Sequence, residues 1–237
     1  MPSSFRFFFV SLILFLQLML RKIFYLSILL LLSVHVIAQN EYFLGEPKVF
    51  NGGLILGANF TQVDGDSYYG YHKVGLNTGG VVYVHLTHSF GLSMELLYSQ
   101  KGSRGEDITG YQGANGTYVE KYFMTLNYVE VPVTLHLIYH RFDVEAGVSY
   151  AYLIKSSEWV ETYQPVVIDP VLNRFNTTDL DYVFGISRRL YKKLYVNARF
   201  QYSITSIRSP DRIPLGYGYG SAGQFNNQFN LRLMYLF

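Results

Sequence analysis

The sequence contains no cysteine at any of its 237 positions. This absence excludes a disulfide scaffold, a thiolate metal site and lipid attachment through an N-terminal cysteine. A charge excess is also missing beyond residue 38, because that part holds all 17 acidic residues and all but three of the 19 basic ones. The near-neutral balance gives no reason to expect nucleic-acid binding.

Long apolar runs are confined to the first 38 residues. The ranges 5–20 and 23–38 are almost wholly apolar and are separated by two basic residues. From Met19 onward, a basic start, an apolar stretch and small residues before the cut form the pattern of a secretory signal peptide. We therefore expect residues 1–38 to be a signal segment that is cleaved after Ala38.

This N-terminal segment leaves two questions open. Met19 is a second candidate for the true start, because a complete signal peptide begins there. The alternative to cleavage is a retained membrane anchor or a helical hairpin, although each run is short for a full span. With cleavage, Gln39 becomes the first mature residue, and residues 39–51 form a short periplasmic segment.

The chain beyond residue 39 lacks the roughly eighteen continuous apolar residues that a transmembrane helix requires. It has one tryptophan but is rich in tyrosine, since 21 of the 22 tyrosines lie in this part. Tyrosine in this quantity is typical of proteins that sit at boundaries between apolar material and water.

Strict alternation of apolar and polar residues is the main pattern in this part. In the range 194–205 one face is apolar and the opposite face is polar, and 142–152 and 228–237 repeat the pattern. A period of two fits a β-strand. The apolar face of the clearest case consists of Leu194, Val196, Ala198, Phe200, Tyr202 and Ile204.

The alternation predicts eight strands, each about long enough to cross a bilayer at a tilt. Their predicted ranges are 52–62, 73–86, 90–101, 122–138, 142–154, 180–189, 193–206 and 226–237. Short connections (87–89, 139–141 and 190–193) alternate with long ones (63–72, 102–121, 155–179 and 207–225). Outer-membrane barrels have short periplasmic turns and long outer loops. We therefore predict an all-β fold, an eight-stranded antiparallel transmembrane β-barrel over residues 52–237, with both termini in the periplasm.

The alternative is a soluble, lipocalin-like barrel whose apolar face fills the interior. An eight-stranded lumen is narrow, and aromatics such as Phe200 and Phe229 would crowd it. The opposite face suits a narrow interior better, because it carries Gly53, Gly57, Gly75, Gly79, Gly91, Gly147 and Gly185. Aromatic residues also gather near both ends of the strands, as in the interfacial girdles of a lipid-facing barrel. These features favour the membrane barrel.

The chain from residue 53 onward resembles the PorT-like outer-membrane β-barrel family of Bacteroidetes. The resemblance rests on five segments in order: GGLILGANFTQVDGD, KVGLNTGGVV, MELLYSQKGSRG, LNYVEVPVTLHL and GVSYAYLI. It implies an outer-membrane barrel with periplasmic termini. The family's founding member is linked to protein secretion, but we do not transfer that activity to this chain.

Charged residues on the predicted inward faces form a candidate lumen network. In a narrow barrel such charges must pair or be hydrated, so we expect them to fill the lumen; a narrow porin-like channel is the alternative. We also expect Pro132 to cause a local bulge or bend, because proline cannot donate to a strand ladder. The candidate network consists of Glu95, Lys101, Glu130, Asp143, Glu145, Asp181, Arg199 and Arg232.

The sequence assigns no catalytic, cofactor or metal site. His85 and His136 are predicted to point inward, and Ser93 or Ser149 could lie near them, but neighbouring strands commonly produce such proximity. The spacing of the histidines around the turns matches no metal-ligand pattern.

We therefore expect a non-enzymatic outer-membrane protein with a structural, partner-binding or secretion-associated role. Its expected partners are outer-membrane lipid and other envelope or secretion proteins. The alternative is a small enzyme that acts on lipid or peptide at the barrel rim.

Overall fold

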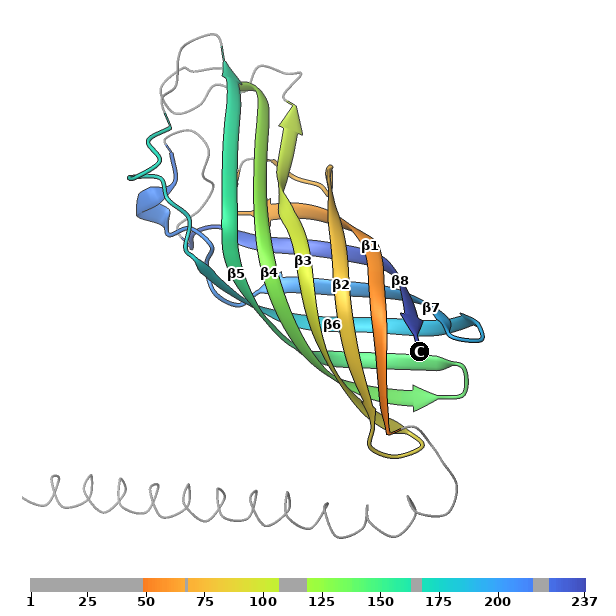
Figure 1. The fold of residues 1–237 in the computed structure, drawn as a ribbon. Coiled ribbons are helices and arrows are strands. Elements are labelled where there is room, and N and C mark those ends of the chain that lie inside the picture. The colour runs from red at the N-terminus through yellow and green to blue at the C-terminus, as the bar shows by residue number, and fades with distance from the viewer. Residues whose placement is uncertain (1–48, 67, 107–118, 163–167, 215–221) are drawn as a thin grey trace, which may run out of the picture. The chain divides into compact units, whose positions relative to one another are not determined.

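Eight β-strands follow one another around a closed barrel (Figure 1). The computed structural model describes residues 49–66, 68–106, 119–162, 168–214 and 222–237. All neighbours pair antiparallel, and β8 closes the barrel against β1. The predicted eight-stranded antiparallel barrel is thus confirmed. The strands are β1 (Phe50–Asp64), β2 (Lys73–His85), β3 (Phe90–Glu106), β4 (Val119–Tyr139), β5 (Phe142–Thr162), β6 (Thr178–Tyr191), β7 (Leu194–Ser203) and β8 (Phe225–Leu236).

Helical structure in the described ranges is limited to a 3₁₀ turn at Pro210–Arg212. In these ranges no helix is long and apolar enough to cross a membrane. The predicted signal segment, residues 1–38, lies outside the described residues.

Apolar side chains cover the outer surface of the barrel. Leu54, Leu96 and Leu135 are 63%, 62% and 62% exposed, whereas Asn197 and Gln201 are buried on the inner face. A water-soluble barrel would have the opposite arrangement, because apolar surface is driven away from water. The soluble alternative is therefore wrong.

Exposed aromatic residues lie near both ends of the strands. Tyr150 and Tyr152 are exposed toward the end with the long loops, and Phe90 and Phe142 are exposed toward the end with the short turns. We call these the long-loop end and the short-turn end. This distribution agrees with the two predicted girdles, which suit the interfaces of a bilayer.

Five strands are longer than the sequence predicted, namely β1, β3, β4, β5 and β6. β3 pairs with β2 only as far as Ser99 but with β4 as far as Glu106. β5 pairs with β6 only as far as Tyr152 but with β4 as far as Thr162. The ends of β3, β4 and β5 therefore form a three-stranded extension that projects beyond the other strands (Figure 1).

Several strand boundaries differ from the predicted ones. The connections predicted at 102–121 and 155–179 begin too early, because β3 ends at Glu106 and β5 at Thr162. β7 ends at Ser203, whereas the prediction extended it to residue 206.

The inner face of β4 within the extension is apolar, so the expectation of a charged, glycine-rich inner face fails on this strand. Its buried residues pack with parts of β1, β5 and the β7–β8 connection, and the core that they form stabilises strands beyond the barrel proper. We call this core the apolar cap. It consists of Val63, Tyr122, Met124, Leu126, Tyr128, Ala151 and Ile207.

Pro132 causes no bulge, so this part of the predicted bulge or bend is wrong. It pairs in register with Ser149 of β5, and the register between β3 and β4 is the same on both sides of it. The two register shifts in this strand lie between Val119 and Lys121 and between Asn127 and Tyr128, and the second is where the extension leaves the barrel. Proline's missing donor thus interrupts the ladder without inserting a residue.

Candidate functional site

Two arginines and two glutamates join four strands inside the lumen. Arg199 Nε lies 2.7 Å from Glu145 Oε1, and its Nη atoms donate to both Glu95 oxygens at 2.8 and 3.0 Å. Arg232 Nη1 donates to Glu95 Oε2 at 2.7 Å. We call these four residues the arginine cluster. Each side chain is at most 1% exposed, and the charges balance within the cluster.

Small and amide side chains complete the arginine cluster. Gly185 of β6 lies between the strands of Glu145 and Arg199, and a Cβ there would collide with Glu145 Oε1. Asn197 donates to Glu145 at 3.0 Å and accepts from Arg232 Nε at 2.8 Å. Buried charges are tolerated when their hydrogen-bonding capacity is met in this way.

A second cluster lies nearer the long-loop end. Lys101 Nζ is 2.6 Å from Glu130 Oε1, 2.6 Å from Asp181 Oδ2 and 3.5 Å from Asp179 Oδ2. Asp179 also accepts from Ser203 at 3.0 Å. We call Lys101 and its three carboxylates the lysine cluster. All four side chains are at most 1% exposed.

The apolar cap lies beyond the lysine cluster and contacts a buried ion pair. Arg208 Nη1 and Nη2 donate to the Glu158 oxygens at 3.0 and 2.5 Å. The Arg208 guanidinium also lies 3.6 Å from the ring centroid of Phe175. Tyr122 of the apolar cap donates to Glu158 at 2.6 Å. The β7–β8 connection is thereby attached to the inner face of β5.

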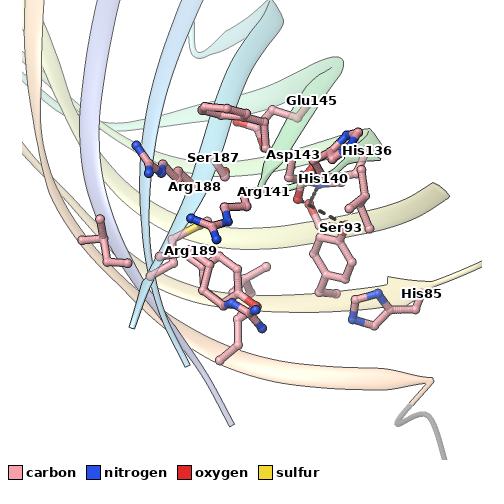
Figure 2. Close-up of a pocket in the computed structure, with 18 of the residues that line it drawn as sticks. His85, Ser93, His136, His140, Arg141, Asp143, Glu145, Ser187, Arg188 and Arg189 are labelled. Atoms are coloured by element: carbon pink, nitrogen blue, oxygen red, sulfur yellow. Dashed lines mark hydrogen bonds and ion pairs between the residues drawn. The ribbon is translucent and has the colours of Figure 1, made fainter. Parts of the chain in front are cut away.

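A cavity of about 510 Å³ lies at the short-turn end, and we call it the mouth pocket. Figure 2 shows its polar lining, which includes arginines from the β4–β5 turn and from the end of β6. Its apolar lining includes Val81, Ile138, Met234 and Leu236. Glu95 and Glu145 of the arginine cluster also line the pocket. The arginine cluster therefore forms the inner end of the mouth pocket.

Ser93, His136 and Asp143 line the mouth pocket as a hydrogen-bonded chain (Figure 2). His136 Nε2 lies 2.8 Å from Ser93 Oγ, and His136 Nδ1 lies 2.9 Å from Asp143 Oδ1. The distances match those of a nucleophile, a base and an orienting acid. The sequence prediction that Ser93 could lie near His136 thus agrees with the geometry, whereas Ser149 pairs with Pro132 farther along the strands.

Other features of Ser93 and its neighbours do not suit acyl transfer. Ser93 is 1% exposed and sits mid-strand, paired with Tyr83 and Thr134, so its backbone belongs to the sheet ladders. Thr134 Oγ1 also lies 3.0 Å from His136 Nε2 and so competes for the same nitrogen. Acyl transfer requires donors aimed at the oxyanion that forms. The hydrogen bonds of Ser93, His136 and Asp143 link β3, β4 and β5.

The predicted network residues form three groups. The arginine cluster contains Glu95, Glu145, Arg199 and Arg232; the lysine cluster contains Lys101, Glu130 and Asp181; and Asp143 joins His136 instead. Sequence reasoning missed Asp179, although it lies two residues before Asp181 and therefore on the same face. It also missed the Arg208–Glu158 pair, which no alternation pattern marks.

Metal binding finds no support in the part of the chain that the structure describes, where no group of three or more potential ligands is arranged around a common point. His85 contacts Asn51 at 3.1 Å, and His136 belongs to the serine–aspartate chain. The rings of His85 and His136 both lie 4.7 Å from the ring of Tyr83, centroid to centroid.

A family model described as outer membrane protein beta-barrel domain matches residues 37–209, which is most of the chain. No curated protein matches the sequence. The matched range contains β1 to β7.

Several solved barrels are similar in structure. Ail, the attachment invasion locus protein of Yersinia pestis, has 12% identity and a TM-score of 0.42, covering 79% of this chain and 98% of that one. The N-terminal β-barrel domain of Pseudomonas aeruginosa OprF has 13% identity and a TM-score of 0.35, covering 79% and 98%. Neisserial surface protein A has 9% identity and a TM-score of 0.38, covering 78% and 97%.

Proposed function

The chain belongs to the outer membrane protein beta-barrel domain family, and we propose that it is a sealed, non-enzymatic barrel that contacts other envelope proteins. The observation that carries this proposal is the filled lumen. The arginine cluster, the lysine cluster and the apolar cap follow one another along the barrel interior. Eight strands leave little space for side chains and water together, so this filling opposes a conducting path.

The non-enzymatic part of the proposal is supported by the surroundings of Ser93. A buried serine within two strand ladders has no backbone donors to offer an oxyanion. The proposed function therefore depends on contacts made by the barrel surface, and not on a reaction inside the lumen.

A partner role is supported by the three-stranded extension. It carries the side chain of Trp159, which is 52% exposed, beyond the strands that close the barrel. Trp159 packs beside Phe123 at 5.4 Å between ring centroids, and Arg104 lies 5.0 Å from the Phe123 ring. Tryptophan and arginine are enriched where proteins bind one another.

The proposal includes the PorT-like assignment within the wider family. The five resembling segments fall mainly on β1 to β5 and carry both inward and outward residues of the barrel. A secretion-associated partner agrees with this assignment and is part of the proposal.

Partner binding is tested by photo-cross-linking from the extension in native outer membranes. A photoreactive residue at Trp159 is expected to capture one defined envelope protein, and the same probe at Leu54, on the lipid-facing surface of β1, is expected not to. Capture of no protein, or of the same mixture by both probes, contradicts the partner role.

The proposed orientation places both termini and the short turns in the periplasm. Because the chain has no cysteine, single cysteines provide clean reporters. A membrane-impermeant maleimide added to intact cells is expected to label Arg212→Cys at the long-loop end and not Lys192→Cys at the short-turn end. Labelling of Lys192→Cys alone would reverse the orientation.

A further inference from the structure

Positive charge is concentrated around the mouth pocket. Arg141 lies in the turn between β4 and β5, and Arg188 and Arg189 lie near the end of β6. All three line the pocket and all three are exposed (Figure 2). The β4–β5 turn and the end of β6 thus bring arginine side chains to one opening.

The acidic residues of the pocket do not compensate these arginines. Glu95 and Glu145 are already paired with Arg199 and Arg232 in the arginine cluster. Only Asp143 remains among the carboxylates that line the pocket.

Asp143 is itself occupied by neighbours. His136 lies 2.9 Å from one of its oxygens, and Tyr83 donates to the other at 3.3 Å. Within the described residues no carboxylate lies within 4.0 Å of the guanidinium groups of Arg141 and Arg189, while Arg188 lies over the ring of Phe142 at 5.6 Å. The opening therefore has an excess of positive charge that is available to a ligand.

The shape and the lining of the pocket limit the class of ligand. A volume of about 510 Å³ lies within the range of small-molecule sites. Guanidinium groups match the planar oxygens of carboxylates and phosphates. Val81, Met234 and Leu236 add an apolar wall. An anion with a short apolar part fits both surfaces.

We propose that the mouth pocket binds a small, water-soluble organic anion that carries a carboxylate or phosphate group. Arg141 and Arg189 hold the anionic group, and the apolar part lies against Val81, Met234 and Leu236. This site goes beyond the proposed envelope role, since a sealed barrel can contact partners with the pocket empty. Failure of binding would therefore leave the cross-linking result and the expected lack of ion conductance through the barrel unchanged.

The test uses the folded full chain in uncharged detergent with n-butyl phosphate and butyrate as the probes. Binding is followed by the imidazole NMR signals of His85 and His136, which both line the pocket. We expect saturable shifts with at least one probe and a Kd of about 1 mM or lower. Neutral n-butanol is expected to bind at least about tenfold more weakly, because it lacks the charge that pairs with arginine.

Two double variants separate the pocket from the general charge of this end. Arg141→Gln with Arg189→Gln removes two charges that line the pocket, and Lys192→Gln with Lys193→Gln removes two charges from the next turn, outside it. The arginine pair is expected to weaken binding about tenfold or more, and the lysine pair less than about twofold. Heat-modifiable migration confirms that each variant is folded.

Three outcomes would overturn the proposal. These are the absence of saturable binding by either probe, equal weakening by both double variants, and binding of n-butanol as tight as that of the anions. A final arm tests lipid as the ligand in nanodiscs of neutral lipid. If added phosphatidylglycerol shifts the same histidine signals and displaces the soluble probes, the site belongs to a lipid headgroup and the soluble ligand is wrong.

Discussion

Arg199 and Glu145 are joined across the lumen by two hydrogen bonds, although a whole strand lies between their positions in the sheet. Arg199 Nε donates at 2.7 Å and Nη2 at 3.0 Å. Gly185, the β6 residue between them, has no side chain to block the contact. This pair, with Glu95 and Arg232, links four strands inside the lumen.

Replacement of Arg199 by methionine should strongly destabilise the barrel. It leaves Glu95 and Glu145 with only Arg232, and an uncompensated buried charge costs about 3–5 kcal/mol. Urea-induced unfolding in detergent measures the change in the free energy of unfolding. The double variant Arg199→Met with Glu145→Met should recover much of this loss, because Glu95 and Arg232 then balance. A double variant that is less stable than Arg199→Met would contradict the pairing.

The Arg208–Glu158 pair makes a separate prediction about the apolar cap. Arg208→Met leaves Glu158 buried without its cation and should lower the local opening free energy by about 3 kcal/mol. Hydrogen exchange should speed up in the described residues 168–176 and 205–213, while β1 and β8 keep their protection. The matched control is Lys121→Met, since Lys121 and Glu161 form an exposed pair expected to contribute less than about 1 kcal/mol. Equal effects of the two variants would refute the role of Arg208.

Asp66, in the turn after β1, predicts a pH dependence of stability. Burial raises the pKa of its carboxyl from 3.8 to about 7, although the Tyr68 N–H donates to its Oδ1 atom at 2.8 Å. The folded state therefore holds a proton that the unfolded state releases above about pH 4. This contribution to stability is present below pH 4 and is lost as the pH rises toward 7.

The variant Asp66→Asn isolates this effect, because an amide resembles the protonated acid. The difference in unfolding free energy between wild type and Asp66→Asn should shift in favour of the variant between pH 4 and pH 7, and then stay level. Urea titrations at several pH values measure it. A constant difference over this range would show that Asp66 has an ordinary pKa.

The Ser93–His136–Asp143 chain predicts an absence of reactivity. A fluorophosphonate probe should leave Ser93 unmodified, because the oxyanion of the adduct would have no donors. Ser93→Ala should cost about 1 kcal/mol, the usual value of a hydrogen bond. Covalent labelling of Ser93 that disappears in His136→Gln would instead establish a hydrolase-like site. Mass spectrometry of the digested protein distinguishes the two results.

The alternation pattern was sufficient to predict the faces of the barrel. Glu145 and Arg199 were placed inward because a strand has a period of two. Their pairing was not predictable, because it depends on the stagger between β5, β6 and β7. Glu95 and Arg232 lie far apart in sequence and meet only through barrel closure and the narrowness of the lumen.

The apolar cap shows where the pattern ends. Tyr122, Phe123, Met124 and Leu126 place apolar residues on both faces of β4, so alternation cannot say which face is inward. The inner face of β4 changes from polar to apolar where the extension leaves the barrel. No sequence pattern indicates at which residue this change occurs. Arg208 lies in a connection, where no periodicity applies at all.

The sealed lumen is the central claim, and single-channel recording in planar bilayers tests it most directly. The expected result is the absence of discrete conductance steps for folded protein whose insertion is verified by heat-modifiable migration of the recovered sample. The arginine and lysine clusters and the apolar cap together predict that silence. Reproducible, discrete steps from the same preparation would contradict the account.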